Sequence, residues 1–242
     1  MTAERVRIMV AEFIGTFALT FIGILSITGD LVAGAAPSPV SLTVVAFAHG
    51  LILAVMIAAL GQTSGGHFNP AVTFGFVTTG RMPLLTGALY WIAQLVGAAL
   101  ASYMLLGMTS ERILMAGTPS PAPNVGVGMA TVLEGIATFF LVLVVFGTAV
   151  DERAPKSVFP FAIGLALTAG MLGIGTITGG SINPARAFGP ALATGDFAKH
   201  YVYWIGPLIG GALGAGVHHF LLMRAPTPIV AERGGPAPSE KR

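Results

Sequence analysis

Two copies of the tripeptide Asn-Pro-Ala are the residues best suited to act together at one point in the molecule. The copies occupy 69–71 and 183–185, and each follows closely on a pair of glycines. Proline suits the first turn of a helix, where a backbone N–H has no partner, and a preceding asparagine can cap that helix. Each copy therefore predicts a helix start with free N–H groups and about half a positive charge. The residues concerned are Asn69, Pro70, Ala71, Asn183, Pro184 and Ala185.

Both tripeptides belong to an internal repeat that covers most of the chain. Segment 64–71 (SGGHFNPA) recurs as segment 178–185 (TGGSINPA). Glu12 and Glu134 stand at matching places ahead of these segments, each followed four residues later by Thr-Phe. Two halves of similar sequence indicate two structural units of the same kind.

The composition excludes a water-soluble protein. The chain has 242 residues, of which 54% are hydrophobic and 9% charged, and its mean hydropathy is +0.83. A soluble domain carries about 25% charged residues, and a disordered chain is poor in hydrophobic residues. With no cysteine there is no disulfide, thiol chemistry or cysteine metal site, and a net charge of +2 does not indicate a nucleic-acid partner. The sequence predicts an integral membrane protein in contact with lipid.

The apolar runs predict an all-α membrane protein with six transmembrane helices and two re-entrant half-helices. A membrane-crossing helix needs about 20 apolar residues, and two of the runs are only half that long. The six predicted spans are 8–28, 41–61, 84–106, 128–149, 159–177 and 201–223; the half-helices are 69–78 and 183–193. One domain is expected over 1–225, with repeats at about 8–115 and 126–225, followed by a disordered cytoplasmic tail at 226–242.

Three spans in each half make an inverted 3+3 repeat, because an odd number of crossings inserts the second half upside down. Six spans place both termini on one side of the membrane. Most basic residues fall on that side: Arg5, Arg7, Arg81, Arg153, Lys156, Arg224, Arg233, Lys241 and Arg242, against Arg112 and Lys199 on the other. The positive-inside rule then predicts cytoplasmic termini, in the plasma or inner membrane of the cell.

Inversion brings the starts of the two half-helices together near the middle of the membrane. Irregular, glycine-rich backbone at that depth is tolerated only where it lines a watery cavity. Asn69 and Asn183 can donate hydrogen bonds to passing water, while Arg186 and the helix N-termini oppose cations. Backbone carbonyls expected to line the path are those of Gly65, Gly66, His67, Gly179, Gly180 and Ser181. These residues predict passage of small neutral molecules and exclusion of ions.

The chain resembles the aquaporin (major intrinsic protein) family from residue 8 to about 223. The resemblance is carried by the paired segments SGGHFNPAV and GGSINPARAFGP and by one Glu in the first helix of each repeat. The resemblance implies a selectivity filter at His49, Met171, Gly180 and Arg186. A histidine at 49, a thioether at 171 and no side chain at 180, together with GDFAKHYVYWIGPLIGG, look most like the tonoplast-type, ammonia-permeable branch. The resemblance also implies that Glu12 and Glu134 anchor the glycine-rich loops, and that the protein is a homotetramer.

We therefore predict a passive channel for water and ammonia, with hydrogen peroxide as a further solute. A glycerol facilitator is the near alternative, although such proteins usually carry Asp where this chain has Ala187 and Pro-Leu where it has Tyr203-Trp204. A proton-coupled transporter is the second alternative, because inverted repeats also build transporters and Glu12 and Glu134 could carry protons. The sequence shows no cofactor motif and no nucleophile–base pair, so neither an enzyme nor a cofactor is expected.

Overall fold

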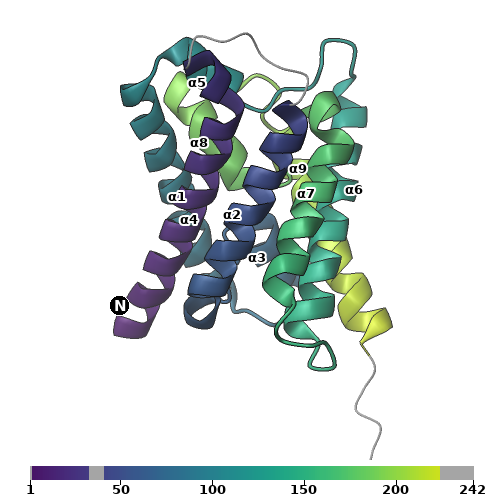
Figure 1. The fold of residues 1–242 in the computed structure, drawn as a ribbon. Coiled ribbons are helices and arrows are strands. Elements are labelled where there is room, and N and C mark those ends of the chain that lie inside the picture. Colours follow the sequence, from purple (N-terminus) through teal and green to yellow (C-terminus); the bar gives the residue numbers. More distant parts are fainter. Residues whose placement is uncertain (1, 33–40, 224–242) are drawn as a thin grey trace, which may run out of the picture.

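The computed structural model describes residues 2–32 and 41–223, and all regular secondary structure in these residues is helical (Figure 1). The long helices are α1 (Ala3–Val32), α2 (Ser41–Ser64), α4 (Leu84–Met108), α6 (Val127–Val145), α7 (Phe159–Thr178) and α9 (Val202–Gly216). The shorter helices are α3 (Pro70–Thr78), α5 (Glu111–Ala116) and α8 (Pro184–Thr194), and the π-helical segments η1 (Phe146–Val150) and η2 (Val217–Leu222) continue α6 and α9. Helix α5 was not predicted from the sequence. The tail predicted at 226–242 lies outside the described residues.

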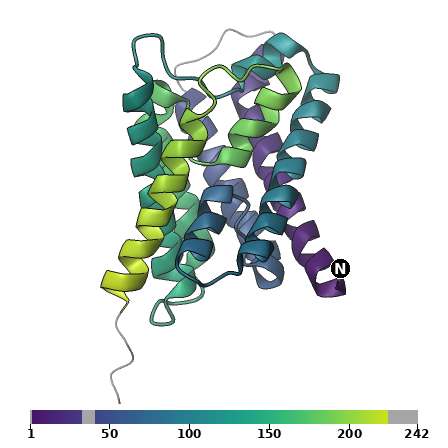
Figure 2. The same cartoon turned by 180° about the vertical axis from the view of Figure 1, so that it is seen from behind.

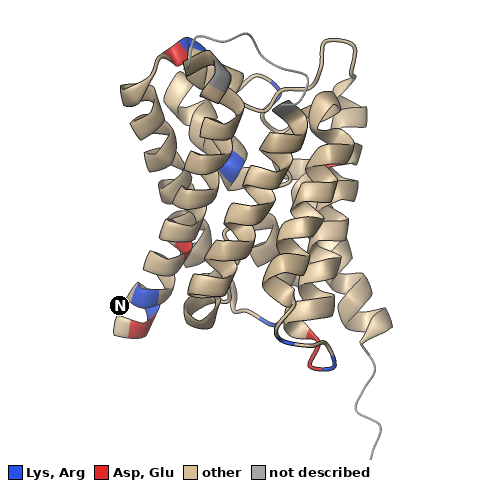
Figure 3. Cartoon of the chain, viewed as in Figure 1, with Lys and Arg blue, Asp and Glu red and all other residues tan. Residues whose placement is uncertain are grey.

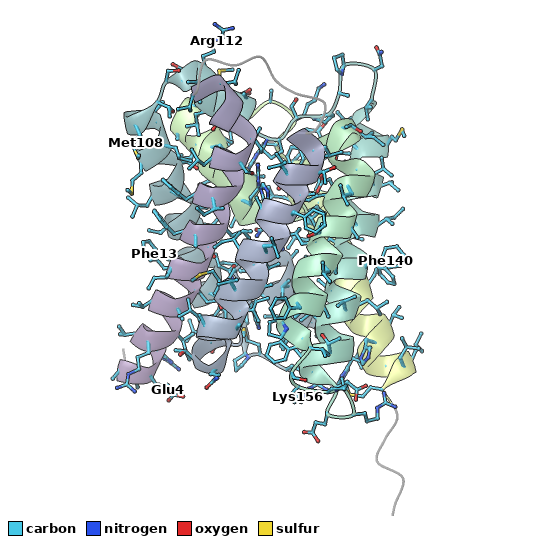
Figure 4. All side chains as sticks on the ribbon, in the orientation of Figure 1. Glu4, Phe13, Met108, Arg112, Phe140 and Lys156 are labelled. Carbon is cyan, nitrogen blue, oxygen red and sulfur yellow. The ribbon has the colours of Figure 1, made fainter. Side chains whose placement is uncertain are left out.

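Within the described residues, six helices are long and apolar enough to cross a membrane, which confirms the predicted fold class. Large apolar side chains are exposed along their outer faces, such as Phe140 and Leu165, and Figure 4 shows Phe13 and Phe140 pointing outward on opposite flanks. Charged positions gather mainly at the two ends of the bundle (Figure 3). An apolar outer surface between two charged ends suits a lipid bilayer.

The two halves interlock through their half-helices. Helix α3 of the first half packs against α9 of the second, and α8 of the second half packs against α4 of the first. A further interface between α2 and α7 joins the halves. Helix α3 lies toward the end of the bundle that carries the N-terminus, and α8 lies toward the opposite end (Figures 1 and 2). The two half-helices therefore start near each other in the middle of the bundle.

Small residues let the long helices approach closely. A Cβ at Gly97 of α4 would lie 2.5 Å from the carbonyl oxygen of Phe13 on α1. In the second half, a Cβ at Gly210 of α9 would lie 2.8 Å from the carbonyl carbon of Gly135 on α6. Both distances are shorter than van der Waals contact, so only glycine fits. Helices in lipid gain their association from such backbone packing rather than from the hydrophobic effect.

At the end that carries the N-terminus, an ion pair joins the two π-helical segments. Asp151 directly follows η1, and the guanidinium of Arg153 donates to both of its carboxylate oxygens. Arg153 also donates to the carbonyl of Leu222 at the end of η2, at 3.3 Å. The hydrogen bonds that Arg153 donates to the carboxylate lower the pKa of Asp151 below its usual value. The Arg153 side chain is 57% exposed while that of Asp151 is 8% exposed, and solvent around the guanidinium keeps the contribution of the pair to stability small.

Candidate pore

Each half-helix starts at a capping asparagine, as the sequence predicts. The side-chain oxygen of Asn69 accepts from the N–H of Ala71 at 2.8 Å, and Pro70 occupies the first helical position of α3. Asn183 caps α8 in the same way, accepting from the N–H of Ala185 at 3.0 Å. The remaining N–H groups and the helix dipoles make both starts electropositive.

The asparagine side chains also tie the two half-helices to each other. The amide nitrogen of Asn69 donates to the carbonyl of Ile182 at 2.9 Å, and that of Asn183 donates to the carbonyl of Phe68 at 2.8 Å. Phe68 and Ile182 have φ of +47° and +55°, in the left-handed region that non-glycine residues rarely adopt. Each asparagine thus uses one amide hydrogen on the opposite half and keeps one for the cavity that both line.

Glu12 holds the glycine-rich loop of the first half. Its carboxylate accepts from the backbone N–H groups of His67 and Phe68 at 3.0 and 2.7 Å. It also accepts from the Ser64 hydroxyl at 2.7 Å and from the Gln94 amide at 2.8 Å. The carboxylate is fully buried, and four donors compensate for its removal from water.

Glu134 makes the equivalent contacts in the second half. Its carboxylate accepts from the N–H groups of Ser181 and Ile182 at 3.0 and 2.7 Å, and from the Thr178 hydroxyl at 2.7 Å. In each half the carboxylate therefore binds the N–H of the left-handed residue itself. This contact supports the strained backbone that aims a carbonyl at the opposite asparagine.

The structure brings His49 and Arg186 into direct contact. Arg186 Nε donates to His49 Nε2 at 3.3 Å, and Arg186 Nη1 donates to the carbonyl of Gly117 at 3.0 Å. The other ring nitrogen, Nδ1, lies 2.8 Å from the carbonyl of Val45. A carbonyl can only accept, so Nδ1 carries the proton and Nε2 is the acceptor that Arg186 requires. The histidine is neutral, with its ring orientation fixed at both nitrogens.

Two cavities meet at Arg186, which lines both of them, and His49 lines the inner one. The inner cavity has a volume of about 30 Å³, which is room for only a few water molecules. Its polar lining consists of His49, Gly65, Gly66, His67, Asn69, Ser181, Asn183 and Arg186, and the rest of its wall is mainly aliphatic. The outer cavity is larger, about 250 Å³, and Ala116 at the end of α5 is part of its lining.

The other two predicted filter residues lie next to each other, but of the two only Met171 lines one of these cavities. Met171 of α7 is buried and lines the outer cavity. Gly180 lies beside it, since a Cβ built at 180 would be 3.5 Å from the Met171 Cα and 3.1 Å from the Gly175 Cα. Gly179, whose carbonyl was predicted to be an acceptor along the path, also lines the outer cavity.

The His67 ring is packed rather than free. Its Nδ1 lies 3.1 Å from the Thr73 hydroxyl, and its ring centroid lies 4.4 Å from that of Phe76 and 5.0 Å from that of Tyr90. The ring contributes to the wall of the inner cavity near the end that carries the N-terminus.

Sequence reasoning missed three contributors to this site. The carbonyl of Gly117 holds Arg186, Gln94 supplies the fourth donor to Glu12, and the left-handed pair Phe68 and Ile182 presents the carbonyls that join the halves. Only the last pair had a signal in the sequence, because each member directly precedes an Asn-Pro-Ala tripeptide. The other two contacts depend on segments far apart in the chain.

An inverted bundle with two half-helices that start at one narrow cavity is the architecture of a membrane transport protein. The sequence profile described as Major intrinsic protein matches residues 1–218. The chain belongs to the major intrinsic protein family, whose members include the aquaporins.

Similar proteins agree with this assignment. The chain is 41% identical to the probable aquaporin TIP2-1 of Oryza sativa subsp. japonica, over 94% of this chain and 92% of the relative. It is 44% identical to the aquaporin TIP4-4 of Zea mays, over 91% and 88% of the two chains, and 42% identical to the aquaporin TIP2-1 of Arabidopsis thaliana, over 90% and 88%. The X-ray structure of the aquaglyceroporin from Plasmodium falciparum superposes with a TM-score of 0.80 at 24% identity, covering 90% of this chain and 97% of that one. That likeness concerns the fold.

Proposed function

We propose that the protein is a passive channel for water and ammonia, and for hydrogen peroxide as a further solute, that excludes protons and other ions. The observation that carries this proposal is the His49–Arg186 pair, in which Arg186 lines both cavities and His49 lines the inner one. Arg186 offers further N–H donors, while Asn69 and Asn183 each keep one amide hydrogen for the inner cavity. A small neutral molecule can exchange its bonds with water for these bonds along the path.

Cations meet a large barrier at the same place. The guanidinium of Arg186 lines both cavities, and the positive ends of α3 and α8 face the inner one. Repulsion between two like unit charges about 4 Å apart costs about 4 kcal/mol at an effective dielectric constant near 20. The two helix N-termini, with about half a charge each, add to this cost. Hydronium faces the same repulsion, and the asparagine donors orient water oxygens toward the middle of the path.

Ammonia fits this path for two reasons. It accepts one hydrogen bond and donates three, so it can use the Arg186 donors and the carbonyl acceptors in turn. The family register places Gly180 in the filter beside Met171. Because it carries no side chain, it leaves that filter wider than a larger residue would. Peroxide, a neutral molecule with both donors and acceptors, has the same access.

Orientation and assembly are parts of the same proposal. Arg5, Arg7, Arg81, Arg153 and Lys156 belong to the end of the bundle that carries the N-terminus, which we place on the cytoplasmic side of the cell membrane. We propose a homotetramer with one pore per protomer. Native mass spectrometry of the detergent-solubilised protein tests the assembly, and a mass other than that of four chains contradicts it.

Stopped-flow measurements on one batch of proteoliposomes test the function. Shrinkage in an osmotic gradient, followed by light scattering, reports water, and alkalinisation of a trapped pH dye after ammonia addition reports ammonia. We expect both rates to exceed those of empty liposomes. Fast shrinkage with unchanged alkalinisation would refute the ammonia part.

The same vesicles separate the alternatives. Entry of glycerol as fast as that of water would favour a glycerol facilitator. Flux that saturates with solute and requires a pH gradient would favour a proton-coupled transporter, since passive flux through a channel is linear in solute and needs no gradient of protons.

A further inference from the structure

The His49 ring occupies a space on α1 that only glycine provides. An ideal Cβ at Gly23 would overlap His49 Nε2 and would lie 2.6 Å from Cδ2 and 2.8 Å from Cε1. Carbon atoms in contact are about 3.5–4.0 Å apart, so no other residue type fits beside the ring as it stands. The ring edge that bears Nε2, the atom to which Arg186 donates, therefore lies against the bare backbone of α1.

Helix α2 has no room to move away from α1. On its opposite side, a Cβ at Gly50 would overlap the Thr168 hydroxyl and the Gly164 carbonyl of α7. Thr168 also lies 3.3 Å from the carbonyl of Ala46, to which its hydroxyl donates. The backbones of α2 and α7 are thus already in contact. A side chain at 23 has to displace the ring, and the open direction is the cavity that His49 lines.

The second half of the molecule supplies a natural comparison. By the repeat, Gly23 corresponds to Val145 and His49 corresponds to Ile163. Both counterparts line the inner cavity toward the cytoplasmic end and belong to its aliphatic wall. Where the wall is aliphatic, the position on the first helix of the repeat carries a branched side chain. Where the wall includes the imidazole that is bonded to arginine, the same position is glycine and has no side chain.

From this geometry we propose that Gly23 is a positioning residue that sets the opening and the solute selectivity of the filter. Because Gly23 has no side chain, the His49 ring can pack against the backbone of α1. In that position the ring leaves the path clear while Nε2 faces Arg186. The inference rests on the proposed function, in which His49 and Arg186 form the filter. Gly23 itself touches no solute; it acts through the position of the ring.

Substitution of Gly23 by alanine tests the proposal. In Gly23→Ala the ring loses the Arg186 hydrogen bond and moves into the path. We expect water permeability per incorporated protein to fall on the order of tenfold, because the displaced ring narrows the path and a factor of ten needs only a small rise in the permeation barrier. Ammonia permeability is expected to fall further, because ammonia depends on the width of the filter. Gly29→Ala is the matched control, since a Cβ at Gly29 of the same helix meets nothing within 4 Å.

A double variant distinguishes positioning from damage to the fold. In His49→Ala the ring is absent, so the added methyl group of Gly23→Ala has space. We expect the double variant to conduct like His49→Ala alone, which restores the flux that Gly23→Ala loses. Wild-type rates in Gly23→Ala would overturn the proposal, and so would a double variant that stays as slow as Gly23→Ala. Wild-type protein that conducts neither solute would instead refute the proposed function.

Discussion

Replacing Glu134 by glutamine tests whether the buried carboxylates hold the loops or carry protons. The change keeps the shape of the side chain and converts one acceptor oxygen into an NH₂ group. In Glu134 one oxygen accepts from Thr178 and Ser181, and the other accepts from the N–H of Ile182. The Thr178 hydroxyl can rotate and accept instead, but a peptide N–H cannot. Either orientation of the new amide therefore sets one peptide N–H against an NH₂ group.

The expected loss follows from that count. One hydrogen bond from a buried peptide N–H to a charged acceptor is worth about 1.5–3 kcal/mol. For a chain of this size, each kcal/mol lowers the melting temperature by about 2–4 °C. We expect Glu134→Gln to melt on the order of 5 °C below the wild type. We expect a similar drop in melting temperature for Glu12→Gln, because the peptide N–H groups of His67 and Phe68 donate to different oxygens of Glu12. Either orientation of the new amide again leaves one of these N–H groups without its acceptor.

The assay combines a melting curve of the detergent-solubilised protein with permeability in proteoliposomes below the melting temperature. If the carboxylates anchor the loops, water flux persists in folded Glu134→Gln and needs no pH gradient. A variant that melts like the wild type but loses its flux would refute the anchoring role. That outcome would favour the proton-coupled transporter.

Three further predictions concern the proposed filter and the end of the bundle opposite the N-terminus. Arg186→Val removes the charge that both cavities share, so proton leak measured with a trapped pH dye should rise by at least tenfold, and unchanged leak would take Arg186 out of that role. Gly180→Ala places a Cβ on a backbone with φ of +57°, which costs about 1–2 kcal/mol, and should lower ammonia flux more than water flux; equal losses would indicate general damage. Burial lowers the pKa of His200 below its usual 6.5, and its Nε2 accepts from the Trp204 indole at 2.9 Å. The stability that neutral His200 provides is complete above about pH 6.5 and is lost as the pH falls toward the lower, folded-state pKa, so the melting temperature should drop over that range in the wild type and less in His200→Gln.

Local sequence signals accounted for the architecture. The span positions followed from apolar length, and the half-helix starts followed from Asn69-Pro70 and Asn183-Pro184, because capping and the first turn of a helix depend only on neighbouring residues. Span ends were less well predicted: α1 begins at Ala3, ahead of the predicted start, since charged residues can continue a helix beyond the apolar layer. Helix α5 escaped prediction because its six residues are too few to show a period.

The proposed filter, at His49, Met171, Gly180 and Arg186, was predicted only as a set of positions, by comparison with the family. Its contacts were decided by the tertiary structure. His49 and Arg186 are 137 residues apart, and Asn69 and Ile182 are 113 apart. Nothing near His49 in the chain indicates that its ring rests on Gly23.

The sequence by itself thus determined an inverted, six-span membrane protein with two capped half-helices, because hydropathy and capping are local properties of the chain. The tertiary structure alone decided how the two halves are tied and how wide the path is. The ties are single hydrogen bonds between distant segments, and the His49 ring lies where α1 carries no Cβ. Packing at that scale is set by atoms brought together from far apart in the chain.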